Sequence, residues 1–202
     1  MKMSATKQLI IDVALELFSV QGFEATSVGQ IADAVGIRKS SLYSHFKSKE
    51  EILSTLLESL SEEYEKNSPL ANSSAGRNAS AFSTEAIITQ VQGQLLFLLH
   101  DAHISKVRKL LTIEQFRNPE ISKMQTKRVY TDILEYNMQT VKALIDAAVL
   151  IDGDAEIMAA QLAFPISAWL ALCDREPERE REVMALVEKH IRQFFAVYGR
   201  NK

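Results

Sequence analysis

The stretch GFEATSVGQIADAVGIRKSSLYSHFKSKEE, residues 22–51, decides the fold of the amino-terminal part of the chain. Thr26 or Ser27 can cap a short helix that ends at Gly36, and a second short helix is expected over residues 38–46. A turn of three residues between two helices usually needs a left-handed backbone conformation, which glycine adopts without steric cost. The stretch therefore predicts a helix-turn-helix.

The segments on both sides of this stretch also have helical patterns. Before it, apolar residues recur at helical spacing over residues 4–20, and Gly22 follows where a helix would end. After it, Ser48 and Glu51 have the spacing of a capping box, for a helix that runs to about Lys66. We therefore expect three helices at the amino terminus and a longer fourth helix after them.

Specific residues in this region match a known family signature. They are Gly22, Phe23, Thr26, Ile31, Ala32, Gly36 and the run Leu42-Tyr43-Ser44-His45-Phe46-Lys47-Ser48-Lys49-Glu50-Glu51. In this order they resemble the tetracycline-repressor (TetR) family of bacterial transcription regulators, over about the first quarter of the chain. The resemblance implies that the third helix enters the major groove of operator DNA and that the flanking segments bind phosphates.

The resemblance and the reach of the side chains together give the candidate DNA contacts. The start of the third helix is expected to meet base edges, and Arg38 can make a bidentate contact to guanine. Tyr43 and His45 resemble the family's phosphate contacts, and Thr26 and Lys49 lie at helix starts that can also hold phosphate. The full set is Thr26, Arg38, Lys39, Ser40, Ser41, Tyr43, His45 and Lys49. Family members usually carry Ser or Thr in place of Arg38, so the operator sequence cannot be transferred from a relative.

The rest of the chain predicts an all-α protein of about nine helices. Residues 1–47 are expected to form the helix-turn-helix DNA-binding domain, and residues 48–202 a larger helical domain for effector binding and dimerisation. Residues 67–83 are rich in Ser, Asn, Ala and Gly and are interpreted as a mobile surface loop. The further helices are expected at residues 84–100, 104–117, 119–150, 154–173 and 178–198. Within the fourth of these, Pro165 should cause a kink.

The last two expected helices are candidates for a dimer interface. Residues 154–173 are apolar on nearly every side, and the helix of residues 178–198 has a wide apolar stripe. Family members generally dimerise through such a pair, which forms half of a four-helix bundle. Burial within one subunit is the alternative. Two heads spaced about one DNA turn apart, roughly 34 Å, would read a palindromic operator.

The resemblance further implies an effector cavity among the central helices. Side chains that could line it are Phe97, Phe116, Met124, Tyr130, Tyr136, Met138, Phe164 and Trp169. Each of them could instead be an ordinary core residue. Because few charges lie on these apolar faces, an apolar or weakly polar effector is favoured, and its binding is expected to release a repressor from DNA.

Composition limits the other possibilities. The net charge is −3, but residues 1–49 hold six Lys and Arg against four Asp and Glu, whereas the rest hold 17 against 22. This distribution suits a protein that touches DNA with one end. The single cysteine, Cys173, excludes an internal disulfide and a Cys-based zinc site. The sequence shows no signal peptide and no run of about 18 apolar residues, so a cytoplasmic protein without membrane spans, metal or cofactor is expected.

Two other functions have some support in the sequence. The residues His100-Asp101 and His103 resemble the metal ligands of all-helical phosphohydrolases. The chain has only four histidines, and the remaining ligands of such a site are missing, so we do not expect an enzyme. The second alternative is a DNA-binding regulator without an effector, whose carboxy-terminal domain serves only dimerisation or protein interaction.

Overall fold

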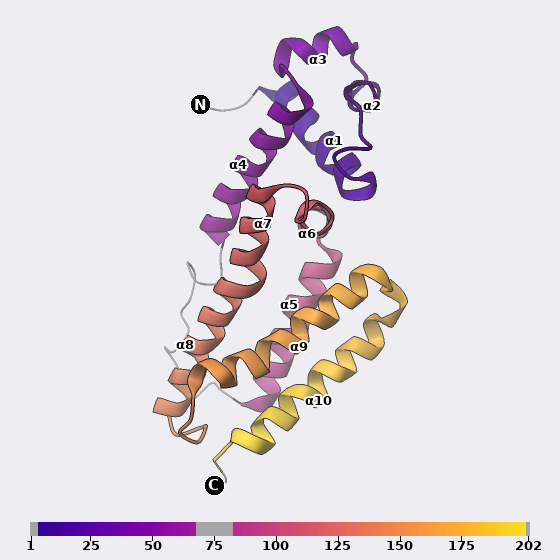
Figure 1. Cartoon of the computed structure of the whole chain (residues 1–202). Helices are drawn as coiled ribbons and strands as arrows, with labels where there is room; N and C mark the ends of the chain where they lie inside the picture. The colour runs from indigo at the N-terminus through magenta and orange to yellow at the C-terminus, as the bar shows by residue number, and fades with distance from the viewer. Residues whose placement is uncertain (1–3, 68–82, 201–202) are drawn as a thin grey trace. The chain divides into compact units, whose positions relative to one another are not determined.

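The structure is a computed structural model that describes residues 4–67 and 83–200 (Figure 1). The regular secondary-structure elements within these residues are all helices. The predicted all-α fold is therefore confirmed. The mobile loop expected over residues 67–83 falls almost wholly on residues 68–82, which lie outside the described residues.

The chain divides into two compact units. Unit 1 holds residues 4–67 and 102–125, and unit 2 holds residues 83–101 and 126–200. The helices of unit 1 are α1 (Ala5–Gln21), α2 (Val28–Val35), α3 (Lys39–His45), α4 (Lys49–Asn67), α6 (Ala102–Glu114) and nearly all of α7 (Pro119–Thr126). The helices of unit 2 are α5 (Thr84–His100), α8 (Asp132–Asp146), α9 (Ala155–Arg175) and α10 (Glu180–Tyr198). The predicted functional boundary after residue 47 does not coincide with this division and stays a prediction.

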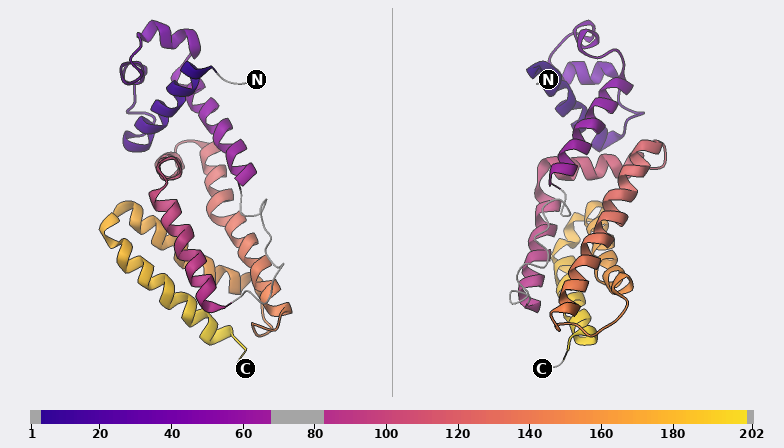
Figure 2. Two further views of the ribbon diagram at one scale, coloured as in Figure 1. Left: turned by 180° about the vertical axis from the view of Figure 1, so that it is seen from behind. Right: turned by 90° about the vertical axis from the view of Figure 1, so that its left-hand side faces the viewer.

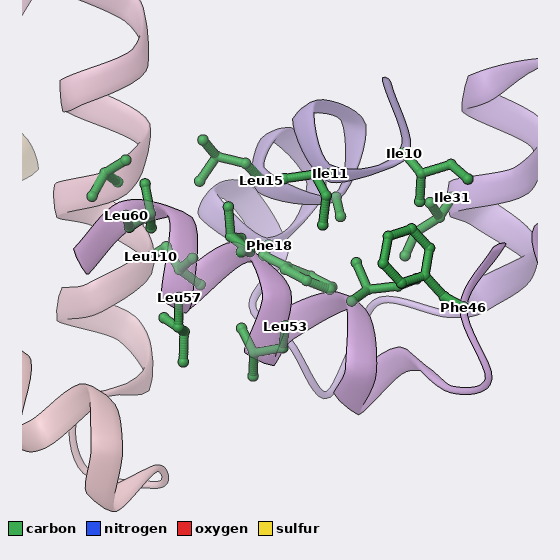
Figure 3. Close-up of a cluster of buried hydrophobic side chains, with 14 of the residues drawn as sticks. Ile10, Ile11, Leu15, Phe18, Ile31, Phe46, Leu53, Leu57, Leu60 and Leu110 are labelled. Carbon is green, nitrogen blue, oxygen red and sulfur yellow. The ribbon is translucent and has the colours of Figure 1, made fainter. Parts of the chain in front are cut away.

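The core of unit 1 joins helices that are far apart in the sequence. Helix α1 packs along α6 and also contacts α2 and α4. Phe18 is completely buried, and its ring meets the ring of Phe23 edge-on with the centroids 5.3 Å apart. Full burial of one such side chain stabilises the fold by about 1.5–3 kcal/mol. Figure 3 shows part of this core, with Ile10, Ile11, Leu15, Phe18, Ile31, Phe46, Leu53, Leu57, Leu60 and Leu110 labelled.

In unit 2, α9 and α10 lie side by side and run in opposite directions (Figures 1 and 2). Helix α9 also packs against α8, and α10 packs against α5. After α10, the backbone pairs with the turn between α8 and α9, because the Ile151 amide donates to the Tyr198 carbonyl at 2.8 Å. The Arg200 amide completes the bridge by donating to the Val149 carbonyl at 2.9 Å.

The prediction of a single helix over residues 119–150 is wrong in its detail. This segment instead forms α7, a π-helical turn over Lys127–Thr131, and α8, which ends at Asp146. The wider turn closes with the Asp132 amide donating to the Lys127 carbonyl, and the side chains of the same two residues form an ion pair at 2.7 Å. The π turn changes the direction in which later side chains point, and Tyr130 stacks on Phe164 with centroids 5.3 Å apart.

Helix α9 continues through Pro165 without an interruption. Its bounds differ from the expected residues 154–173 because Asp154 is the cap, accepting from the amides of Glu156 and Ile157. Of the described helices, α9 alone is long and apolar enough to cross a membrane by length and composition. Only 28% of its most apolar 18-residue window is buried inside this chain. One subunit therefore does not cover this apolar helix on all sides.

Candidate DNA-binding surface

Helix α2 and the turn after it form as the sequence predicts. Ser27, rather than Thr26, is the cap: its hydroxyl accepts from the Gln30 amide at 3.2 Å, and the Gln30 side chain accepts from the Ser27 amide at 2.8 Å. Gly36 has φ of +79°, a left-handed conformation that costs a residue with a Cβ about 1–2 kcal/mol. Its amide bonds back to the Ala32 and Asp33 carbonyls, which ends α2 and directs the chain into α3.

Helix α3 is attached through one side and exposed on the other. Leu42 and Phe46 are buried and hold the helix on the core of unit 1. The polar residues Arg38, Lys39, Ser40 and Ser41 are all exposed, as is Tyr43, and His45 is half-buried. Six of the eight candidate DNA contacts thus lie on one short, accessible segment with two positive charges.

The seventh candidate, Thr26, does not lie on that surface. Its side chain is only 1% exposed. The hydroxyl donates to the Gly22 carbonyl at 2.8 Å and accepts from the Gln21 side chain at 2.9 Å. In this arrangement the hydroxyl fixes the turn between α1 and α2, and its role toward phosphate stays a prediction.

Lys49, the eighth candidate, is directed inward at the first residue of α4. Its ammonium donates to the carbonyls of Phe23 at 2.7 Å and Thr26 at 2.8 Å, with a longer contact of 3.4 Å to Glu24. The same nitrogen lies 4.2 Å from the centroid of the Phe23 ring, a cation–π contact. These contacts occupy the donors of the ammonium, so the sequence-based prediction that Lys49 binds phosphate has a structural competitor.

The start of α4 is partly the predicted capping box. The Ser48 hydroxyl accepts from the Glu51 amide at 3.1 Å, as expected. The Glu51 carboxylate, however, accepts from the amide of Lys47 rather than from that of Ser48. Hydrogen bonds from its own backbone amide and from Ser48 lower the pKa of the Glu50 carboxyl, which suits a negative charge at the positive end of a helix dipole.

Sequence reasoning missed Glu114, the last residue of α6. It is 2% exposed, and its carboxylate accepts from the amide of Phe23 at 2.8 Å. A signal was available in the sequence, because Val107, Leu110, Leu111 and Glu114 have the i, i+3, i+4, i+7 spacing of one helix face. A carboxylate at an apolar-face position indicates a specific partner.

The candidate effector residues are divided between the two units. Phe116 and Met124 belong to unit 1, where Phe116 is 90% exposed and Met124 packs against the core. The others lie in unit 2: Phe97 and Tyr130 are exposed, Tyr136 and Met138 are half-buried, and Phe164 and Trp169 are half-buried with ring partners. The Trp169 ring packs edge-on against His190, with centroids 5.5 Å apart. The effector site stays a prediction.

The histidines that suggested a metal site have other contacts. His100 Nε2 lies 2.9 Å from a carboxylate oxygen of Glu180, and His103 Nε2 lies 3.1 Å from one of Glu63. Within residues 4–67 and 83–200, no group of three or more His, Cys, Asp or Glu side chains is placed to hold a metal ion.

Comparison with known proteins finds transcription regulators that are similar to this chain over the helix-turn-helix. Residues 10–56 match the family model for bacterial regulatory proteins of the tetR family. The regulator AcrR of Shigella flexneri is 49% identical over 53 residues, which are 26% of this chain and 25% of AcrR. The repressor KstR2 of Mycolicibacterium smegmatis is 28% identical over 130 residues, 62% of each chain. The alignments thus span about a quarter to three-fifths of these relatives.

The fold has counterparts among solved structures. SmeT, the repressor of the Stenotrophomonas maltophilia multidrug efflux pump SmeDEF, superimposes with a TM-score of 0.66 at 20% identity, covering 98% of this chain and 92% of SmeT. A SmeT–triclosan complex matches with a TM-score of 0.59 at the same identity, covering 98% and 93%. At this identity the likeness shows the fold alone.

The helix-turn-helix and its matches place the amino-terminal domain in the class of DNA-binding domains of bacterial regulatory proteins. The amino-terminal domain is therefore similar to that of the tetR family, and the chain as a whole shares the fold of SmeT. The matched proteins are transcription regulators, and no enzymatic family is indicated.

Proposed function

We propose that this protein is a DNA-binding transcription regulator that uses α3 as its recognition helix. The observation that carries the proposal is the arrangement of α3: Leu42 and Phe46 anchor it in the core, while its polar residues are accessible. A major groove about 12 Å wide admits one such helix. Arg38, Lys39, Ser40 and Ser41 are proposed to meet base edges, and Tyr43 and His45 to meet phosphates.

Operator binding tests this proposal directly. Wild-type protein is titrated onto a DNA fragment from upstream of its own gene and onto a scrambled fragment of equal length. Arg38→Ala is expected to weaken specific binding by about 1–3 kcal/mol, and Lys142→Ala, an exposed lysine on α8, is the matched control. Equal wild-type affinity for the two fragments would argue against sequence-specific regulation by this site.

The proposed assembly is a homodimer through α9 and α10. The support is the low internal burial of α9, together with the exposure of Ile157 on α9 and Val197 on α10. A second copy would cover this apolar surface and would present two recognition helices to a palindrome. Ala168→Arg, at an exposed position of α9, is expected to yield monomers in sedimentation, whereas a Lys142→Ala control stays dimeric.

A membrane would also cover α9, so the proposed cytoplasmic location is tested separately. Cell fractionation is expected to leave the protein in the soluble fraction. Recovery only after detergent extraction would instead support insertion of α9.

The proposed regulation is release of a repressor by a small apolar or weakly polar effector. Support comes from relatives: SmeT and KstR2 are named repressors, and SmeT has been solved with triclosan. A coupling of about 1–3 kcal/mol between effector and DNA would change affinity roughly 5- to 150-fold. Titration of the DNA complex with triclosan as a probe measures this coupling.

A regulator without an effector is the second candidate. It is favoured by the high exposure of Phe116, Phe97 and Tyr130, which are proposed pocket residues and yet are accessible at the surface. A protein whose operator affinity is indifferent to a panel of apolar compounds, and whose thermal stability they leave unchanged, would fit this second candidate.

A further inference from the structure

The turn between α1 and α2, residues Gly22–Thr26, is held by a buried carboxylate on one side. The Phe23 amide donates a hydrogen bond to the carboxylate of Glu114, on α6, at 2.8 Å. Gly22 has φ of +82°, and a Cβ on it would lie 3.0 Å from the same carboxylate oxygen. The absence of a side chain at Gly22 therefore lets the turn approach α6 this closely.

The same turn is held on its other side by an ammonium. Lys49 of α4 donates to the carbonyls of Phe23 and Thr26 and lies over the Phe23 ring. The two peptide groups of Phe23 are thus bonded to opposite charges that come from two different helices. Hydrogen bonds to charged groups are stronger than neutral ones, and removing one partner leaves a buried group unsatisfied.

We infer that Glu114 and Lys49 are positioning residues for the helix-turn-helix, and that Lys49 acts through the α1–α2 turn rather than through a DNA phosphate. We call Phe23, Glu114 and Lys49 the turn clamp. Through it, α2 and α3 take their position from both α4 and α6. This inference rests on the proposed function, since it concerns the placement of the recognition helix.

The clamp gives a route by which α6 can act on the DNA-binding helices. The carboxylate at the end of α6 bonds directly to the turn that leads into α2, and the Lys49 ammonium joins α4 to the same turn. The apolar contacts of Val107 and Leu110 with the core add rigidity along the rest of α6. A shift of α6 along its axis therefore moves the turn with it.

The first experiment asks whether Lys49 neutralises a phosphate. Operator affinity of the Lys49→Met variant is measured over a series of salt concentrations. A lost phosphate contact lowers the slope of log affinity against log salt by about 0.9, whereas a lost positioning contact leaves the slope unchanged. We expect affinity to fall with an unchanged slope, and Arg38→Ala gives a comparison from the exposed surface. A reduced slope, or an unchanged affinity, would overturn the inference for Lys49.

The second experiment measures the clamp without DNA. Hydrogen exchange at the Phe23 amide is followed by NMR in the full-length protein. Glu114→Met removes the acceptor at similar length and is expected to speed exchange roughly tenfold, the loss of one hydrogen bond to a charged group. Glu114→Gln keeps an acceptor oxygen and should restore most of the protection. Glu120→Met, at an exposed position of α7, is the control.

The outcomes separate this inference from the proposed function. If wild-type protein binds no operator while Phe23 exchange responds to Glu114→Met, the function is wrong and the clamp stands as a structural contact. If DNA binds and Phe23 exchange is the same in Glu114→Met and wild type, the clamp is refuted. If Glu114→Met does not fold, the Glu114→Gln and Lys49→Met measurements decide.

Discussion

The two units of the molecule differ in the kind of polar contact that joins the helices within each unit. In unit 1, beside exposed pairs such as His103 with Glu63, two charged side chains that are buried or half-buried end on backbone groups of a distant segment: Glu114 and Lys49 at Phe23. In unit 2, the charged links between helices are exposed side-chain pairs, such as Arg192 of α10 with Glu85 of α5 at 2.6 and 2.9 Å. The Glu114–Phe23 and Arg192–Glu85 contacts join residues 91 and 107 positions apart, but they differ in what they fix.

The difference concerns position more than stability. An exposed ion pair is screened by water and leaves its long side chains free to adopt other rotamers, so it contributes little. A buried charge bonded to a main-chain amide is costly to displace and fixes the backbone itself. Unit 1 thus has the rigid links where a recognition helix must be held in place.

The largest effect is expected in the apolar core of unit 1. Phe18→Ala removes a fully buried ring and leaves a cavity, which should lower the free energy of unfolding by about 3–5 kcal/mol. Chemical denaturation followed by circular dichroism measures it. A loss below 1 kcal/mol would mean that the cluster in Figure 3 can repack around the gap.

A smaller loss is expected at the α1–α2 turn. Thr26→Val keeps the shape of the side chain but removes its hydroxyl. The Gly22 carbonyl then loses this donor, and the side-chain amide of Gln21 loses this acceptor. The expected cost is about 1–3 kcal/mol of unfolding free energy. Thr26→Ser, which retains the hydroxyl, is the paired variant. If Val and Ser behave alike in denaturation, the hydroxyl does not hold the turn.

The turn between α2 and α3 should respond to a single methyl group. Gly36→Ala places a Cβ in the left-handed conformation, although no atom lies within 4 Å of it. We expect a cost of about 1 kcal/mol from backbone strain alone. Gly93→Ala, in the interior of α5 with equally open space, should be neutral or stabilising by thermal melting. Equal effects at the two glycines would contradict the backbone explanation.

The smallest effect is expected at the exposed pair of unit 2. The hydrogen bond from Arg192 lowers the pKa of the Glu85 carboxyl from its ordinary value of 4.5. The pair therefore contributes stability that is present above about pH 4.5 and is lost as the pH falls through the lowered pKa. Glu85→Gln should melt slightly below wild type at pH 7, and the difference should shrink as the pH falls below about 4.5. A difference that does not shrink as the pH falls would rule out the charge as its cause.

Local signals made most of the fold predictable. The helix-turn-helix follows from the capping residue Ser27, from Gly36 and from the apolar spacing that buries Ile31 and Leu42, all within about twenty residues. Features that depend on distant partners were not predictable in the same way. The π turn at Lys127–Thr131 interrupts a segment whose sequence has a continuous helical pattern. It was not predictable, because the residues of the turn do not differ in type from those of an ordinary helix.

The candidate site was predictable in its exposed half only. Arg38, Lys39, Ser40, Ser41 and Tyr43 were predicted to be accessible because a short helix after a turn has one exposed face, and the structure exposes all five. Lys49 and Thr26 have the residue types of phosphate contacts, but the sequence gives no distance to the carbonyls that they contact. Only the folded structure shows that the basic residue at this helix start, Lys49, is directed toward the interior.

The pairing of Trp169 with His190 has a practical consequence. Trp169 is the sole tryptophan of the chain, and it lies on α9 against α10. Its intrinsic fluorescence consequently reports the environment of unit 2, whereas the indole spectrum carries no direct signal from the helices around α3. Unit 2 thus contains a tryptophan probe that unit 1 lacks, which allows the unfolding of unit 2 to be followed separately by fluorescence.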